Sequence, residues 1–204
     1  MTKISLLDMM KERKHITIDI VGDSITWGLN HCGSDETYTA QYAKMLSEKY
    51  PAAAVYRYDG IMHNALLPME SFEGPIGVND GGGEVRIDVI RNGIGGNTVR
   101  RAIKRIDDFT GGLANGRHAD ITVFMFGIND ALKEDASKYV TPERFAEDYR
   151  ELIQSFIKTE RGVIAIMSAT TNGPTLGEYV ERTEEVAAEC GALYIDLHRV
   201  WQEH

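Results

Sequence analysis

The segment from Ile121 to Phe126 is almost entirely apolar, and polar or turn-forming residues stop it sharply at both ends. Asp120 precedes it, and Gly127-Ile128-Asn129-Asp130 follows it. A strand with one wet face alternates apolar and polar residues, whereas a strand covered on both faces is apolar nearly throughout. The segment is also far too short to cross a bilayer as a helix. We therefore expect a central strand of a sheet that carries helices on both faces.

Four other segments have strand character, and segments with helical spacing of their apolar residues separate them. The expected strands are 16–21, 85–90, 121–126, 163–167 and 193–196, and the expected helices are 37–49, 99–106, 141–157 and 178–190. Strands that alternate with helices connect in parallel through right-handed crossovers. The predicted fold is a three-layer α/β/α sandwich around a five-stranded, parallel, doubly wound sheet of the flavodoxin-like kind.

One stretch, residues 56–84, does not fit this alternation. It contains two prolines and several glycines, among them the triplet Gly81-Gly82-Gly83, and is long for a connection between elements. We interpret it as a loop insertion in an otherwise single domain that spans residues 1–204.

Composition narrows the classes of function. The chain has 204 residues, 43% of them hydrophobic, and a net charge of −9. A chain of this size buries about 70% of its surface on folding, which provides a full core. Its negative field repels nucleic-acid phosphates and anionic membrane surfaces, so we expect neither as a partner.

Targeting, redox and metal signals are weak. Residues 1–15 mix apolar and charged side chains, which is not typical of a secretory signal and favours a cytoplasmic location. Cys32 and Cys190 are interpreted as free thiols. Since no His, Cys, Asp and Glu grouping has the spacing of metal ligands, we expect no metal and no other cofactor. The oligomeric state stays open.

Three polar or glycine-rich turns follow three of the predicted strands, where function collects in sheets of this kind. Ser24 follows the first strand, Gly96 the second and Asn129 the third. A serine on a tight turn can present both its hydroxyl and its N–H, and a glycine lets a substrate oxygen approach its N–H closely. With the Asn129 amide these donors would form an oxyanion hole, which predicts acyl transfer at Ser24.

These residues carry a resemblance to the SGNH hydrolases, also called the GDSL esterase/lipase family. Gly22-Asp23-Ser24-Ile25, Gly93-Ile94-Gly95-Gly96-Asn97-Thr98 and Gly127-Ile128-Asn129-Asp130 resemble the first three sequence blocks of that family, in the same order. The resemblance implies a small-molecule ester as substrate, Ser24 as nucleophile, and Gly96 and Asn129 as oxyanion donors beside the Ser24 N–H.

The fourth block of the family, an Asp three residues before the catalytic His, has no match here. Asp196-Leu197-His198 has the wrong spacing, and His204 has Trp201 where the acid would stand. His198 is a candidate general base, but the family's strand order would put it about 14 Å from the Ser24 strand, three spacings away. We expect the chain as given to lack the C-terminal catalytic block; His31 is the best of the remaining histidines.

Other interpretations remain open at this point. Ser24 could merely cap a turn, and the 93–98 loop could bind phosphate, although Thr98 stands where a dinucleotide fingerprint needs glycine. A non-catalytic ligand-binding module without a general base is the main alternative to an esterase, and a nucleotide-binding sheet is a third.

Two further expectations concern the surroundings of the site. The basic residues Arg100, Arg101, Lys104 and Arg105 are interpreted as the solvated face of their helix. In the insertion, Asp59, Asn64, Asn79 and Asp80 would suit a hydroxyl-rich ligand, which favours acetylated carbohydrates as substrates.

Overall fold

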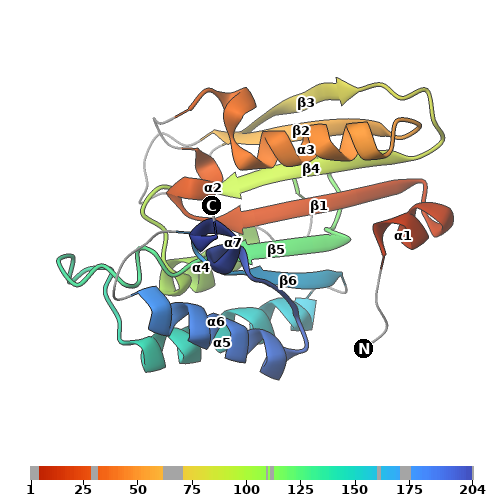
Figure 1. Ribbon diagram of the computed structural model, residues 1–204. Coiled ribbons are helices and arrows are strands. Elements are labelled where there is room, and N and C mark those ends of the chain that lie inside the picture. The colour runs from red at the N-terminus through yellow and green to blue at the C-terminus, as the bar shows by residue number, and fades with distance from the viewer. Residues whose placement is uncertain are drawn as a thin grey trace.

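A computed structural model describes residues 5–28, 32–61, 71–108, 110, 113–159, 162–170 and 176–203. Its centre is a seven-stranded sheet in the order β3-β2-β4-β1-β5-β6-β7 (Figure 1). The strands are β1 His15–Gly22, β2 Ala54–Ile61, β3 Ser71–Asn79, β4 Arg86–Gly93, β5 Ile121–Met125, β6 Val163–Met167 and β7 Leu193–Ile195. The helices are α1 Leu6–Glu12, α2 Ser24–Trp27, α3 Tyr38–Lys49, α4 Val99–Lys104, α5 Pro142–Thr159, α6 Leu176–Cys190 and α7 Leu197–Gln202, with short 3₁₀ turns at Ser34–Glu36 and Ile106–Asp108.

The five predicted strands are confirmed as β1, β4, β5, β6 and β7. They lie side by side and parallel, in the order β4-β1-β5-β6-β7. β5 lies between β1 and β6, and Thr122 through Met125 are buried, as the apolar segment predicted. The α/β/α class is therefore confirmed, with a sheet that is larger than expected by two strands.

The additional strands correct the interpretation of residues 56–84 as a loop insertion. β2 pairs parallel with β4, and β3 pairs antiparallel with β2 at the sheet edge. Pro75 lies within β3, where an edge strand tolerates a missing N–H, and the β2–β3 pairing has two register irregularities. Glycine and proline therefore obscured two real strands; residues 62–70, which include Asn64, lie outside the described residues.

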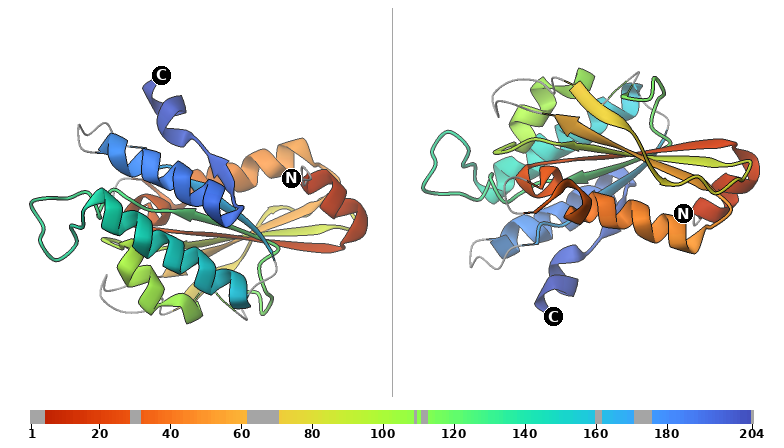
Figure 2. Two further views of the ribbon diagram at one scale, coloured as in Figure 1. Left: turned by 90° about the horizontal axis from the view of Figure 1, so that it is seen from below. Right: turned by 90° about the horizontal axis from the view of Figure 1, so that it is seen from above.

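Two apolar clusters fill the space between the layers, one on each face of the sheet. On one face, Ile16, Ile18 and Ile20 of β1 pack with residues of α1 and α3. On the other, Val21 packs in a larger cluster with α4, α5 and α6. Figure 2 shows α3 on one side of the twisted sheet and α4 and α5 on the other.

The helices follow from their sequence signals. α5 begins at Pro142, within one residue of the expected helix 141–157, and the Thr141 hydroxyl accepts a hydrogen bond from the Arg144 N–H at 3.3 Å. α1, α2 and α7 were not expected, because each has only four to seven residues and little apolar periodicity. Among the described residues, no helix is long and apolar enough to cross a membrane.

Candidate active site at the carboxyl edge of the sheet

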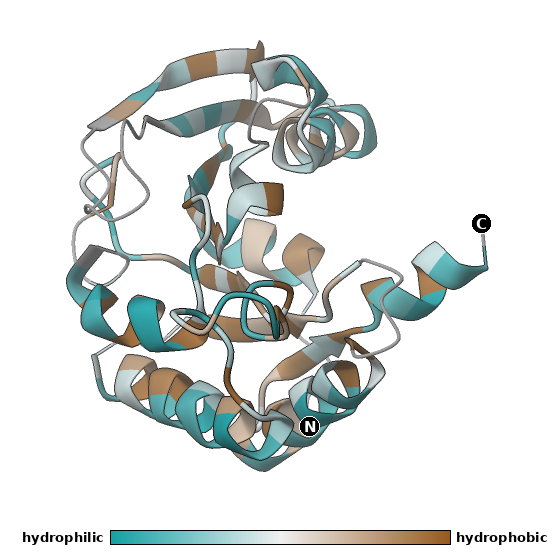
Figure 3. Cartoon of the chain, turned by 90° about the vertical axis from the view of Figure 1, so that its left-hand side faces the viewer, coloured by the Kyte–Doolittle hydropathy of each residue, from teal (hydrophilic) through white to brown (hydrophobic). Residues whose placement is uncertain are grey.

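The three predicted site residues leave the sheet from one row. Gly22, the last residue of β1, pairs with Gly93 at the end of β4 and with Met125 at the end of β5. The segments that continue to Ser24, Gly96 and Asn129 therefore start level with one another on adjacent strands. Figure 3 looks onto this edge of the sheet.

Ser24 is the first residue of α2, a single helical turn. The Asp23 carboxylate caps the turn by accepting a hydrogen bond from the Ile25 N–H at 2.9 Å, and Gly28 closes it with a φ of 77°. An N–H at the first position of a helix has no partner inside the helix. Ser24 is partly exposed, so its hydroxyl is not sealed in the core.

Glycines let α2 pack directly on the strands beneath it. A Cβ at Gly93 would lie 2.3 Å from the Trp27 nitrogen, and one at Gly22 would lie 2.1 Å from the Thr26 hydroxyl oxygen. Both distances are impossible for a real side chain. The glycines at the ends of β1 and β4 therefore fix the height of Ser24 above the sheet.

Gly96 lies in the turn that follows β4, with a φ of 69° that glycine adopts without strain. The Asn97 N–H closes the turn on the Ile94 carbonyl at 3.1 Å. The Arg101 guanidinium donates to the Gly96 carbonyl at 2.9 Å, which turns that carbonyl toward α4. Gly96 itself is partly exposed.

Hydrogen bonds tie the second and third segments to each other and to the first. The Asn129 side-chain amide donates to the Asn97 carbonyl at 2.9 Å, and the Asn97 amide donates to the Gly22 carbonyl at 3.4 Å. A carboxamide nitrogen carries two hydrogens, so the bond to Asn97 orients Asn129 and leaves a second donor. Sequence reasoning missed the role of Asn97, since only the fold brings its carbonyl to Asn129.

Two buried carboxyl groups flank the candidate site residues. Burial raises the pKa of Asp23 to about 6 and the pKa of Asp130 to about 7. Repulsion by the negative charge of Asp23 adds to the rise at Asp130. Asp130 accepts a hydrogen bond from the Val99 N–H at 3.1 Å. Near neutral pH Asp130 is therefore partly protonated, while Asp23 stays mostly ionised.

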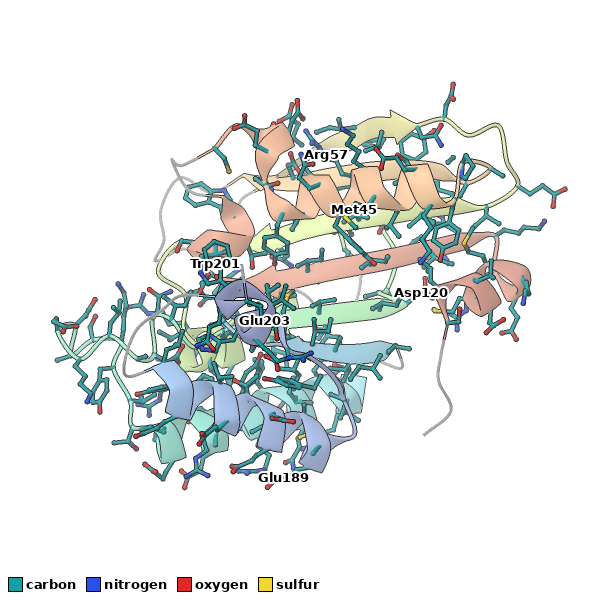
Figure 4. The ribbon with its side chains drawn as sticks, viewed as in Figure 1. Met45, Arg57, Asp120, Glu189, Trp201 and Glu203 are labelled. Carbon is teal, nitrogen blue, oxygen red and sulfur yellow. The ribbon has the colours of Figure 1, made fainter. Side chains whose placement is uncertain are left out.

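The structure places the described histidines away from this cluster. His15 contacts Asp88 at 2.8 Å at the amino end of β1, and His118 precedes β5 at the same end, which Asp120 marks in Figure 4. His31, His63 and His204 lie outside the described residues.

His198 lies on α7, beyond the carboxyl end of β7. That strand is three steps from β1 in the sheet, as expected. The His198 N–H donates to the Ser168 hydroxyl at 2.8 Å, and its ring nitrogens contact the Ala169 carbonyl at 3.2 Å and the Gln202 side chain at 2.8 Å. Within the described chain these are its hydrogen-bond partners, and Ser24 is not among them.

Two expectations about the surroundings are wrong. Asp59 is buried in ion pairs with Arg57 and Arg91, at 3.5 and 3.3 Å, and does not face solvent. Asn79 pairs with Val55 near the amino end of β2, so Asn79 and Asp80 lie at the opposite edge from Ser24. The three described residues of that prediction, Asp59, Asn79 and Asp80, therefore do not form the expected ligand surface, and Asn64 lies outside the described residues.

The basic face of α4 is only partly solvated. Arg100 and Lys104 are exposed, but Arg101 and Arg105 are only partly exposed, and Arg101 bonds the Gly96 carbonyl. No periodicity signal could have identified this contact, because it depends on how the 93–98 turn folds back onto α4.

Comparisons with known proteins bear on both fold and family. The sequence model of the GDSL-like Lipase/Acylhydrolase family matches residues 76–204, which include Gly96 and Asn129. A search among curated proteins gave no match.

Solved structures with the same fold cover nearly the whole chain. The SGNH-hydrolase family esterase AlinE4 has 15% identity over 91% of this chain and 78% of its own, with a TM-score of 0.61. The acetylxylan esterase Axe2 from Geobacillus stearothermophilus has 20% identity over 93% of this chain and 81% of its own, with a TM-score of 0.62. A third, the acetyl xylan esterase AlAXEase, has 18% identity over 92% and 80%, with a TM-score of 0.62.

The family match spans more than half of the chain, and the three sequence blocks lie together at one edge of the sheet. The chain belongs to the GDSL-like lipase/acylhydrolase family, the SGNH hydrolases.

Proposed function

We propose that this protein is a serine esterase that hydrolyses small acyl esters through an acyl-enzyme on Ser24. The observation that carries the proposal is the common row of Gly22, Gly93 and Met125, from which the segments bearing Ser24, Gly96 and Asn129 leave the sheet. The hydroxyl of Ser24 is the nucleophile, and its N–H, the Gly96 N–H and the Asn129 amide are the oxyanion donors.

In the first step, the Ser24 oxygen bonds to the ester carbonyl carbon, and the carbonyl electrons move to its oxygen. The three donors stabilise that negative charge, and each donor of this kind typically lowers the barrier by about 2.7–4 kcal/mol. Collapse of the intermediate breaks the bond to the alcohol oxygen, and the alcohol leaves with the proton that the Ser24 hydroxyl gave up. Water then attacks the acyl carbon, its hydroxyl stays in the released acid, and its other proton restores the Ser24 hydroxyl.

We base the proposed substrate class on the structures that share this fold. Two of the similar structures are described as acetyl xylan esterases. We therefore include acetylated carbohydrates among the proposed substrates.

The Ser24 hydroxyl has to give its proton to a general base. Because His198 makes other contacts, we also consider a second function. His198 bonds Ser168, Ala169 and Gln202 and not Ser24 within the described residues. A binding module that keeps the oxyanion donors without a general base would have this arrangement. The second proposal is thus ligand binding without turnover.

The first prediction separates the two. If a general base serves Ser24, the protein hydrolyses p-nitrophenyl acetate and Ser24→Ala lowers kcat on the order of a millionfold, since the nucleophile and its base act as a unit. The measurement is p-nitrophenol release with intact-mass detection of an acyl adduct at Ser24.

Ser47→Ala is the matched control, because the Ser47 hydroxyl only bonds the Lys44 carbonyl within α3. It should keep full activity. Hydrolysis that persists in Ser24→Ala would contradict the esterase proposal, and ester binding without turnover in both proteins would favour the binding module.

A further inference from the structure

A basic cavity lies between α4, the 131–140 segment and α5, next to the candidate site. Its volume is about 610 Å³. Five cationic side chains from these three parts line it, against the two acids Asp148 and Glu151: they are Arg100, Arg101, Lys104, Lys138 and Arg144. This concentration of positive charge stands out in a chain with a net charge of −9.

Arg100 of α4 and Arg144 of α5 share one buried acid. The Asp148 side chain is only 2% exposed and pairs with Arg100 at 3.2 Å and with Arg144 at 2.5 Å. A carboxylate between two guanidinium groups attracts both and offsets part of their positive charge. The wall formed by Arg100 and Arg144 is therefore a poor place for a further anion.

The other three cations have fewer acidic partners. Arg101 donates to the neutral Gly96 carbonyl, and within the described part of the chain it has no carboxylate partner. Lys104 makes no hydrogen bond or ion pair with any described residue. Lys138 pairs with Asp135 at 2.9 Å, and its side chain is 22% exposed. Arg101, Lys104 and Lys138 thus bring three positive charges to the cavity, against the carboxylates of Asp135, which pairs with Lys138, and Glu151, which lines the cavity.

Two of these groups also border Gly96. A methyl group at Gly96 would lie 3.5 Å from Lys138 Cε, 3.7 Å from Lys138 Nζ and 3.8 Å from Arg101 Nη1. The cavity therefore opens beside the residue that we assign as an oxyanion donor. In Figure 1 the 131–140 segment extends past the carboxyl ends of the strands, on the side of the molecule where α2 lies.

We propose that this cavity binds a carboxylate or phosphate group, with Arg101 and Lys138 as its contact residues. Guanidinium groups bind such planar or multi-oxygen anions through paired hydrogen bonds, and a lysine adds a point charge. The anion is carried by the ester substrate or is a free ion; the substrate-borne case rests on the proposed function.

The first test measures binding without catalysis. Ser24→Ala protein is titrated with inorganic phosphate and with glucuronate at low salt, and binding is followed by calorimetry and thermal shift. Lys138→Gln should weaken phosphate binding about tenfold, as expected for one charge-assisted hydrogen bond. Arg101→Lys, which keeps the charge but loses the paired geometry, should weaken it by less than Lys138→Gln.

Lys133→Gln is the matched control. Lys133 lies on the same segment, is exposed and does not line the cavity, and its replacement changes the net charge equally. It should bind phosphate like the parent. Equal weakening in Lys133→Gln and Lys138→Gln would mean a general field effect and would overturn the site.

The second test asks whether the substrate carries the anion. The ratio of kcat/KM for 4-acetoxybenzoate to that for the neutral 4-acetoxybenzamide is measured in the parent, Lys138→Gln and Lys133→Gln. If the substrate carries the anion, the ratio falls about tenfold in Lys138→Gln only, and it falls in the parent when salt screens the charges.

The outcomes are distinguishable. Phosphate binding with no preference for the charged ester supports a free-ion site. Binding without any hydrolysis removes the esterase and keeps the anion site, whereas hydrolysis with neither binding nor preference overturns the anion site alone.

Discussion

Asp19 is completely buried in the middle of β1, the strand that leads to Ser24. It stands in register with Thr122 of β5. Burial raises the pKa of Asp19 to about 8, against a smaller lowering by the Asn92 side chain. At neutral pH the folded protein therefore favours the protonated acid, while the unfolded chain releases that proton above its ordinary pKa near 3.8.

This difference predicts how stability depends on pH. The contribution of Asp19 is fully present below about pH 4 and is lost as the pH rises to about 8, because the unfolded state then binds fewer protons. Asp19→Asn removes this dependence, so its Tm should exceed the parent's by more at pH 8 than at pH 5. About 1 kcal/mol shifts Tm by about 2–4 °C at this chain length.

Thermal unfolding at several pH values measures the difference. Asp8→Asn, at an exposed position in α1, is the control and should shift Tm equally at both pH values. A constant offset in Asp19→Asn would show that the acid is not protonated in the folded state.

The element that carries the nucleophile is a single turn of helix with little packing of its own. α2 holds its place because Gly93 of β4 admits the backbone at Thr26 and Trp27. The Arg91 guanidinium adds a hydrogen bond to the Trp27 carbonyl at 2.6 Å. Contact between two backbones leaves no side chain that could move aside.

Gly93→Ala should therefore displace α2 rather than be absorbed. We expect the unfolding free energy to fall by about 1–3 kcal/mol, as for other overpacked sites. We also expect kcat to fall, because a displaced α2 moves Ser24. The measurements are chemical denaturation and steady-state hydrolysis. Gly177→Ala, where nothing lies within 4 Å of the added carbon, should be neutral or slightly stabilising.

If Gly93→Ala keeps full activity and stability, the glycine does not position α2, and the nucleophile is held by other contacts.

The two largest apolar cores among the described residues share one sheet, beside a smaller cluster around Ile90. Leu46 of α3 belongs to the cluster on one face and is 5% exposed, while Phe156 of α5 belongs to the other and is 1% exposed. β1 contributes to both clusters, Ile18 to the first and Val21 to the second. Loss of either core therefore removes support from the central strand.

We accordingly predict one cooperative transition. Leu46→Ala and Phe156→Ala should each lower the unfolding free energy by about 2–5 kcal/mol, and each should shift the whole transition. Far-UV circular dichroism reports all elements, and tryptophan fluorescence reports Trp27 and Trp201. Trp201 lies on α7, 58% exposed (Figure 4).

The two signals should coincide in both variants. Leu132→Ala, on the exposed 131–140 segment, should change stability by less than about 0.5 kcal/mol. Two separated transitions in either core variant would show that the faces unfold independently.

The sequence alone determined where the five parallel strands lie along the chain and which turns follow them. The apolar run at Ile121 and the cap residues Thr141 and Pro142 are local signals, since burial and capping depend on neighbours a few residues away. The same locality applies to Ser24, Gly96 and Asn129, because a residue directly after a parallel strand has to lie at the carboxyl edge.

Only the tertiary structure decided which residues meet across that edge. β2 and β3 form because their backbones pair with β4 and with each other, and no local pattern in a segment rich in glycine and proline reveals such pairing. Several contacts connect residues that are far apart in sequence or that a loop brings together. They are the bond from Asn129 to Asn97, the ion pairs that bury Asp59, and the approach of Arg101 and Lys138 to Gly96. Periodicity records which face of an element is buried, but the partner on that face is fixed only when the layers pack.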